Sequence, residues 1–125
     1  MDRTRAMASA ASALALAGVL VLGAPASARE VQKEGGCVGP ADWRLEVENE
    51  DGGLQVDLRI RGPEDRVWDV RIKHDGIRFF HDTRNTGADG EFRIRRQRPN
   101  TAGTDTIFFR ALGPGDQVCE GRIVF

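Results

Sequence analysis

Hydrophobic and polar residues alternate along most of the chain, with the repeat of two that is typical of β-strands with one buried face. The clearest case is the stretch 66–80, in which Trp68, Val70 and Ile72 alternate with charged residues. The Asp75-Gly76 pair inside this stretch is a strong hairpin signal, because both residues tolerate the positive φ of a tight turn. The stretch therefore predicts two antiparallel strands that bury the face of Trp68.

The same alternation predicts seven strands in all, and no part of the chain shows helical periodicity. The predicted strands span residues 42–49, 54–61, 66–74, 77–84, 91–97, 104–112 and 117–125. Seven short strands separated by turns every 8–12 residues or so are typical of a two-sheet sandwich. The predicted fold class is therefore all-β, a seven-stranded antiparallel immunoglobulin-like sandwich, with a closed barrel as the alternative.

The hairpin turns also predict which residues lie opposite one another. A turn at Asp51-Gly52 keeps every apolar pair on one face and predicts the pairs Val47–Val56, Leu45–Leu58 and Trp43–Ile60. A turn at Asp75-Gly76 predicts the pairs Ile72–Phe79, Val70–His81 and Trp68–Thr83. Matching the buried faces of the last hairpin predicts that Ala111 lies opposite Cys119.

The first 28 residues have the organisation of a secretory signal peptide. Arg3 and Arg5 precede an apolar run at 6–24, and Ala26-Ser27-Ala28 provides small residues at a cleavage site. The run is rich in Ala, Ser and Gly, which argues against a membrane-spanning helix. We therefore predict a signal peptide at 1–28, a flexible lead-in at 29–41, a β-sandwich domain at 42–125, and a secreted, extracellular protein with no membrane span after cleavage.

Cys37 and Cys119 are the only two cysteines of the chain. Export makes a disulfide their expected state, since thiols are oxidised outside the cell. A domain of this size buries a modest share of its surface, so a bond that closes a long loop adds useful stability.

Several short motifs together resemble a known group of proteins. They are Cys37, Trp43, Trp68-Asp69-Val70, Asp89-Gly90, Asp105, Arg110-Ala111 and Cys119-Glu120-Gly121. Over residues 37–125 they resemble the framework of small secreted actinobacterial proteins of immunoglobulin-like or fibronectin III-like sandwich type, a group with no established activity. The resemblance implies the sandwich architecture alone, because the disulfide would join the start of the domain to its last strand instead of two central strands.

The residue types left for chemistry argue against an enzyme. Residues 29–125 contain no Ser, Tyr or Met, which excludes a Ser nucleophile. His74 and His81 fall at separate positions of the predicted hairpin, without a third ligand at metal spacing. We therefore predict no catalytic residue, no metal and no cofactor, and we leave open weak calcium binding by the loop at 82–91.

Charge is unevenly distributed along the chain. Residues 42–69 hold nine acidic and four basic residues, whereas residues 71–98 hold eight basic and four acidic ones. If the strands at 77–84 and 91–97 are neighbours, one outer face gathers arginines around an exposed aromatic ring. The residues of this candidate binding face are Arg78, Phe80, Arg84, Arg93 and Arg95.

These observations favour a secreted, non-enzymatic binding module. An arginine-rich face suits an extracellular protein or an anionic polymer, such as an acidic glycan or a cell-wall polymer. The overall charge of −1 does not favour nucleic acid, and we predict a monomer. A protease inhibitor presenting Arg96-Gln97-Arg98-Pro99 and a small-ligand carrier are the alternatives.

Overall fold

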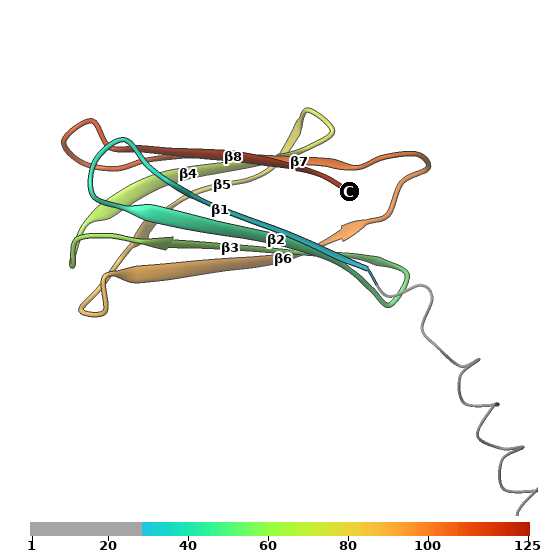
Figure 1. The fold of residues 1–125 in the computed structure, drawn as a ribbon, viewed down its shortest axis with the longest axis horizontal. Coiled ribbons are helices and arrows are strands. Elements are labelled where there is room, and N and C mark those ends of the chain that lie inside the picture. The colour runs from blue at the N-terminus through green and yellow to red at the C-terminus, as the bar shows by residue number, and fades with distance from the viewer. Residues whose placement is uncertain (1–28) are drawn as a thin grey trace, which may run out of the picture.

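The computed structural model describes residues 29–125, so the predicted signal peptide at 1–28 lies outside the described residues (Figure 1). This part of the chain forms eight β-strands and no helix. Accordingly, none of its segments is a helix long and apolar enough to cross a membrane. The strands are β1 (Glu30–Gly36), β2 (Asp42–Glu50), β3 (Gly53–Arg61), β4 (Val67–His74), β5 (Ile77–Asn85), β6 (Glu91–Pro99), β7 (Thr106–Leu112) and β8 (Val118–Val124).

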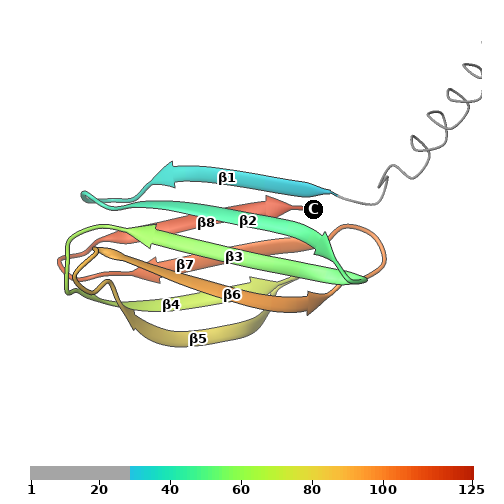
Figure 2. The same cartoon turned by 90° about the horizontal axis from the view of Figure 1, so that it is seen from below.

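The strands form two four-stranded antiparallel sheets that lie in two layers (Figures 1 and 2). The strand orders are β1-β2-β3-β6 and β5-β4-β7-β8. The inward residues of both sheets share one core, in which Trp68, Leu45, Leu58 and Phe109 are fully buried. The all-β class and the two-sheet arrangement are therefore confirmed, and the closed barrel is excluded for the described residues.

The structure corrects the number of strands from seven to eight. The additional strand is β1, which occupies most of the segment predicted to be a flexible lead-in. The alternation of apolar residues gave no signal here, because Val31 is the single large apolar residue of β1. The strand forms by backbone pairing with β2, and Gly35 fits there because a Cβ atom would lie 2.8 Å from the ring of Trp43.

The predicted register of the first hairpin is confirmed. Val47 lies opposite Val56, and the two further predicted pairs of this hairpin also form. Asp51 and Gly52 both have positive φ, as the turn requires. At the other end of the chain Ala111 lies opposite Cys119, as predicted.

The predicted register of the second hairpin is wrong beyond its turn. Asp75 and Gly76 do have positive φ, but the pairing shifts at Ile72/Lys73, where β5 contains one extra residue. Ile72 therefore lies opposite Phe80 instead of Phe79. Because strand side chains alternate between faces, this bulge reverses the orientation of every later residue of β5.

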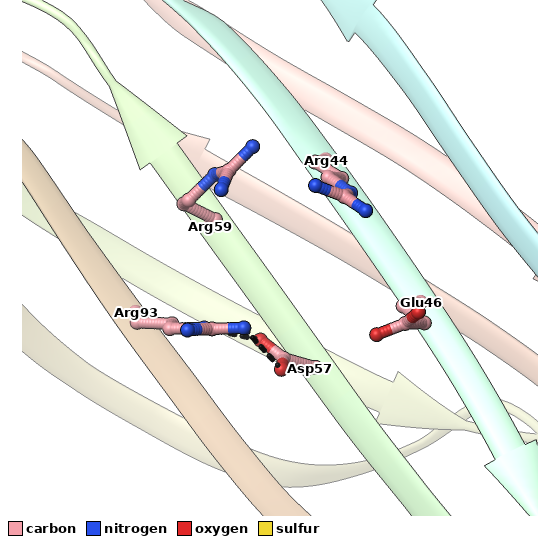
Figure 3. Close-up of a pocket in the computed structure, with 5 residues that line it drawn as sticks. All are labelled: Arg44, Glu46, Asp57, Arg59 and Arg93. Atoms are coloured by element: carbon pink, nitrogen blue, oxygen red, sulfur yellow. Dashed lines mark hydrogen bonds and ion pairs between the residues drawn. The ribbon is translucent and has the colours of Figure 1, made fainter.

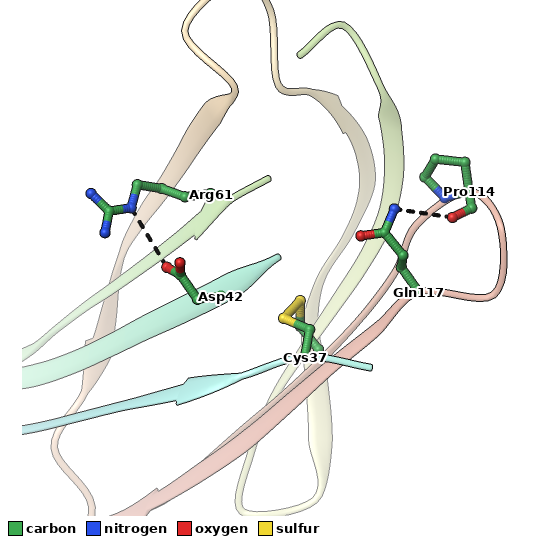
Figure 4. The surroundings of a disulfide bond; sticks show 6 residues. Cys37, Asp42, Arg61, Pro114 and Gln117 are labelled. Atoms are coloured by element: carbon green, nitrogen blue, oxygen red, sulfur yellow. Dashed lines mark hydrogen bonds and ion pairs between the residues drawn. A yellow bond between two sulfur atoms is a disulfide. The ribbon is translucent and has the colours of Figure 1, made fainter. Parts of the chain in front are cut away.

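The predicted disulfide is present between Cys37 and Cys119 (Figure 4). It joins the connection after β1 to β8, and Val38 pairs with Val118 beside it. A closed loop of 82 residues contributes about 4–5 kcal/mol to the free energy of unfolding in the chain-entropy model. The bond therefore fastens the edge strand β1 to the second sheet.

Candidate functional site

The outer face of the β5-β4-β7-β8 sheet gathers cationic side chains around one aromatic ring. We call this surface the basic face and define it by Arg71, Lys73, Arg78, Phe108, Arg110, Glu120 and Arg122. Alternation places these residues outside, because their neighbours Ile72, Ile107 and Phe109 fill the core. The site is therefore a consequence of the strand pattern of β4, β7 and β8, together with the start of β5.

The strand register brings the residues of the basic face together. Arg71 of β4 lies directly opposite Arg110 of β7. Two residues further along β7 on the same face, Phe108 lies opposite Lys73 of β4 on one side and opposite Arg122 of β8 on the other. Directly opposed like charges repel one another in a sheet. The opposed pair of Arg71 and Arg110 therefore favours an anion over this part of the face.

The basic face is hollowed. Its depression has a volume of about 440 Å³ and is lined by Arg71, Lys73, Gly76, Arg78, Phe108, Arg110 and Glu120. This volume lies in the range of about 300–1,000 Å³ that is typical of ligand pockets. Gly76 belongs to the tight β4–β5 turn, so the turn forms one end of the depression.

The cations of the basic face have few anionic partners. Arg71 Nη2 lies 3.5 Å from Asp69 Oδ2. Among residues 29–125, the four other cations of the face have no carboxylate oxygen within 4.0 Å. Glu120, although directly opposite Arg110, forms no ion pair with it. Most of the positive charge on this face is therefore available to a ligand.

The outer face of the β1-β2-β3-β6 sheet is different, because its central carboxylate, Asp57, is paired with arginine (Figure 3). Asp57 is 5% exposed. Arg93 contacts both of its carboxylate oxygens, with Nε–Oδ1 and Nη2–Oδ2 distances of 3.1 Å, and Arg95 Nε lies 3.0 Å from Oδ2. The hydrogen bonds and charge of Asp57 raise the pKa of Arg93. We call this surface the paired face and define it by Arg44, Glu46, Asp57, Arg59, Arg93 and Arg95.

The centre of the paired face offers little room for a ligand. Its hollow has a volume of about 30 Å³ and is lined by Arg44, Glu46, Asp57, Arg59 and Arg93. That volume holds about one water molecule. Arg93 and Arg95 bind a buried carboxylate of their own sheet, so they stabilise the fold.

The five residues predicted to form one binding face do not come together. Arg78 belongs to the basic face, whereas Arg93 and Arg95 lie on the paired face. Phe80 is 6% exposed and packs in the core, which corrects its predicted outward position. Arg84 lies over the Phe80 ring, 5.1 Å from its centre.

Two physical reasons explain this correction. The bulge in β5 turns Phe80 inward, and β5 and β6 belong to different sheets although they follow one another in the chain. Alternation along the sequence is enough to place Arg71, Phe108 and Arg110 on the outer side of their strands. The sequence contained no signal that β4 and β7 are neighbours, so the face that they form was missed.

A buried polar cluster lies at the β4–β5 turn and the loop before β7. His74 Nε2 lies 2.7 Å from Asp105 Oδ1, and both residues are nearly inaccessible to solvent. The Thr101 hydroxyl donates to the same oxygen over 2.6 Å. Arg98 Nε donates to His74 Nδ1 over 3.3 Å, so Nε2 carries the ring hydrogen and donates to Asp105.

Two residues of this cluster, His74 and Asp105, also lie close to Asp75. Within residues 29–125, these three form the group whose ligand atoms are close enough together to hold a metal ion. Both ring nitrogens of His74 already have hydrogen-bond partners, and Arg98 brings a positive charge beside the ring. The Thr101 hydroxyl binds Asp105 and not the ring, so these residues do not form a nucleophile–base pair. The contacts fit a structural network that fastens the loop to the turn.

The hydrogen bonds of this network decide the charge of Asp105. Burial by itself would raise the pKa of Asp105, but hydrogen bonds from the Thr101 hydroxyl, His74 and the Thr101 amide together lower it. Asp105 is therefore an anion at neutral pH although it is buried.

Two residues of the loop considered for calcium, Asp82 and Asn85, use their side-chain oxygens internally. Asp82 Oδ1 accepts from the Thr83 amide over 2.8 Å, and its other oxygen lies 3.1 Å from Arg84 Nη1. Asn85 Oδ1 accepts from the Gly87 amide over 2.6 Å. These contacts are ordinary turn hydrogen bonds.

Compared with known proteins, the chain matches no family model, no curated protein sequence and no solved structure.

Proposed function

We propose that this protein is a non-enzymatic binding module that holds an anionic ligand on its basic face. The observation that carries the proposal is the depression of about 440 Å³, in which three cations without an acidic partner among residues 29–125 lie around Phe108. They are Lys73, Arg78 and Arg110. Arg71 and Arg110 are directly opposed, and the ion pair of Arg71 with Asp69 leaves Arg110 without a carboxylate partner among residues 29–125. An anion relieves the repulsion between the two arginines. On the paired face Arg44 and Arg59 also lack an ion pair among residues 29–125, but the hollow that they line has a volume of about 30 Å³.

We further propose that the sandwich is of immunoglobulin-like type and acts outside the cell. The chain moves between the two sheets after β3, after β5 and after β6, a crossing pattern that is typical of Greek-key sandwiches. The disulfide supports an oxidising compartment. A protease inhibitor is less favoured, because residues 96–98 are paired within β6 and Arg96 lies 4.9 Å from the centre of the Phe80 ring.

The test compares two double variants that remove the same charge from opposite faces. Lys73→Gln/Arg110→Gln alters the basic face, whereas Arg44→Gln/Arg59→Gln alters the paired face. Binding to immobilised poly-L-glutamate is measured by surface plasmon resonance at rising salt. We expect wild type to bind at low salt, and binding to fall as salt exceeds about 0.1 M, where exposed charges are screened beyond about 10 Å.

We expect the basic-face variant to bind at least about tenfold more weakly, equivalent to about 1.4 kcal/mol. The paired-face variant is expected to bind within about twofold of wild type, since long-range charge alone contributes little at moderate salt. Equal losses in the two variants would mean that net charge, and not the basic face, determines binding. Failure of the wild-type protein to bind at low salt would reject the proposal.

A further inference from the structure

Among the anions that the basic face suits, its lining distinguishes one chemical class. We propose that the ligand is a segment of an acidic polysaccharide whose sugar rings carry carboxylates; this inference rests on the proposed function. Three features of the lining point to this class: the guanidinium groups, the half-buried ring of Phe108 and the unpaired carboxylate of Glu120. Each one corresponds to a different part of a uronic acid unit.

The cations suit carboxylates. Arg71 and Arg110 lie directly opposite one another on neighbouring strands, and both line the depression. A guanidinium group presents two parallel N–H donors that match the two oxygens of a carboxylate. Lys73 and Arg78, opposite one another on β4 and β5, continue the positive charge along the depression. A linear chain with repeated carboxylates can therefore contact several cations at once.

Phe108 provides an apolar platform in the middle of these charges. It is half-buried, and its neighbours Ile107 and Phe109 supply the core contacts of β7. The ring lies in one row with Lys73 and Arg122. A flexible polyanion without rings gains little from such a platform, whereas a pyranose ring can lay its C–H face on the negatively polarised face of an aromatic ring.

Glu120 separates sugars from ligands that carry charge alone. Its carboxylate lines the depression and has no ion-pair partner among residues 29–125. An ionised carboxylate accepts hydrogen bonds but donates none. Sugar hydroxyls can donate to it, whereas polyphosphate and the backbone of nucleic acids offer oxygens that it repels.

The experiment measures the affinity of the full domain for four probes at equal ionic strength. The probes are polygalacturonate, poly-L-glutamate, polyphosphate and single-stranded oligothymidylate. They respectively present carboxylated sugar rings, carboxylates without rings, charge alone, and phosphates with aromatic bases. We expect polygalacturonate to bind at least about tenfold more tightly than each of the other three, a difference of about 1.4 kcal/mol.

Two variants assign this preference to residues. Phe108→Leu keeps an apolar side chain but removes the ring, and we expect it to weaken polygalacturonate binding about tenfold while poly-L-glutamate stays within about twofold. Glu120→Gln should weaken the binding of polygalacturonate, because its hydroxyls lose an ionised acceptor. The same change should strengthen the binding of poly-L-glutamate and polyphosphate, because a repulsive charge is removed. Thermal melting of both variants checks that the fold is retained.

The outcomes separate this inference from the proposed function. Equal affinity for polygalacturonate and poly-L-glutamate, unaffected by Phe108→Leu, would overturn the inference of an acidic polysaccharide ligand. The proposed function, a face that binds anions, would stand. Tightest binding of oligothymidylate would overturn it in favour of base stacking on the ring. No binding of any probe would overturn both proposals.

Discussion

The two outer faces of this sandwich come from the same alternation of residues and yet have opposite character. On the paired face a buried carboxylate, Asp57, holds Arg93 and Arg95 in place. On the basic face Arg71 and Arg110 oppose each other, and Glu120 neutralises neither of them. The difference teaches that the number of arginines on a sheet does not identify a binding surface. What matters is whether their charges are already satisfied within the fold.

Like charges also meet on the paired face, where Glu46 lies opposite Asp57 and Arg44 opposite Arg59. There β6 resolves the acidic pair, because it places Arg95 opposite Asp57 on the other side. It places a further arginine, Arg93, opposite Arg59, and Arg93 binds the carboxylate of Asp57. The basic face has no equivalent strand that brings enough carboxylates. The basic face therefore keeps cations that an anion can neutralise, whereas Asp57 already binds two arginines on the paired face.

The largest expected effect tests whether the paired face is structural. Replacing both Arg93 and Arg95 with Gln leaves the charge of Asp57 buried without a counter-ion. We expect the free energy of unfolding to fall by about 2 kcal/mol, below the range for fully buried pairs because both arginines are more than half exposed. Urea denaturation measures the change.

The matched control for this prediction removes the same charge from the basic face. Arg71→Gln/Arg110→Gln should alter the free energy of unfolding by less than about 0.5 kcal/mol, the usual range for exposed substitutions. If both double variants lost the same stability, the contrast between the faces would be wrong.

A second, smaller effect separates the buried cluster from the faces. Because the pKa of Asp105 is lowered in the folded protein, its ionised form contributes stability above the ordinary pKa of 3.8, and this stability is lost as pH falls toward the folded value. Asp105→Asn should therefore cost about 1 kcal/mol at pH 7, and the cost should shrink in acid. Denaturant unfolding across pH measures it.

Asp116→Asn is the control for this pH dependence. Asp116 is exposed and forms no ion pair within the described part of the chain, and Asn tolerates its positive φ of 64°. The control should unfold like wild type at every pH. If the loss in free energy of unfolding caused by Asp105→Asn did not change with pH, the charge of Asp105 would not contribute to stability, and the prediction would be wrong.

The smallest effect compares one carboxylate from each face. The pKa of Glu46 is raised, first by a hydrogen bond with Glu30 and then by burial and the charges of Glu30 and Asp57. A raised pKa means that the contribution of Glu46 to stability is lost as pH rises through the folded value. Glu46→Gln should therefore stabilise the protein at pH 7, by a few tenths of a kcal/mol.

Glu120→Gln is the matched change on the basic face. Glu120 lies directly opposite Arg110 and far from such crowding, so its removal should lower the free energy of unfolding slightly or leave it unchanged. Parallel thermal melts at pH 7 and in mild acid compare the two variants. A loss of stability in Glu46→Gln at pH 7 would contradict the crowding of carboxylates on the paired face.

Much of the fold was encoded locally in the sequence. The alternation around Trp43, Trp68 and Phe109 placed these side chains in the core, and the Asp-Gly pairs specified two hairpin turns. The pairing of Cys37 with Cys119 followed from the absence of any other cysteine. These features depend on the period of a strand or on the φ preference of a turn, which neighbouring residues determine by themselves.

Which residues share the basic face was decided by the tertiary structure. One bulged residue in β5 turned Phe80 inward, and the packing of two aromatic rings against the core outweighed the simpler register. The separation of β5 from β6 divided the predicted arginines between two faces, while the pairing of β4 with β7 joined Arg71 to Arg110. Sequence alternation determines on which side of a strand a residue lies, but the order of strands in a sheet depends on long-range pairing that no local pattern contains.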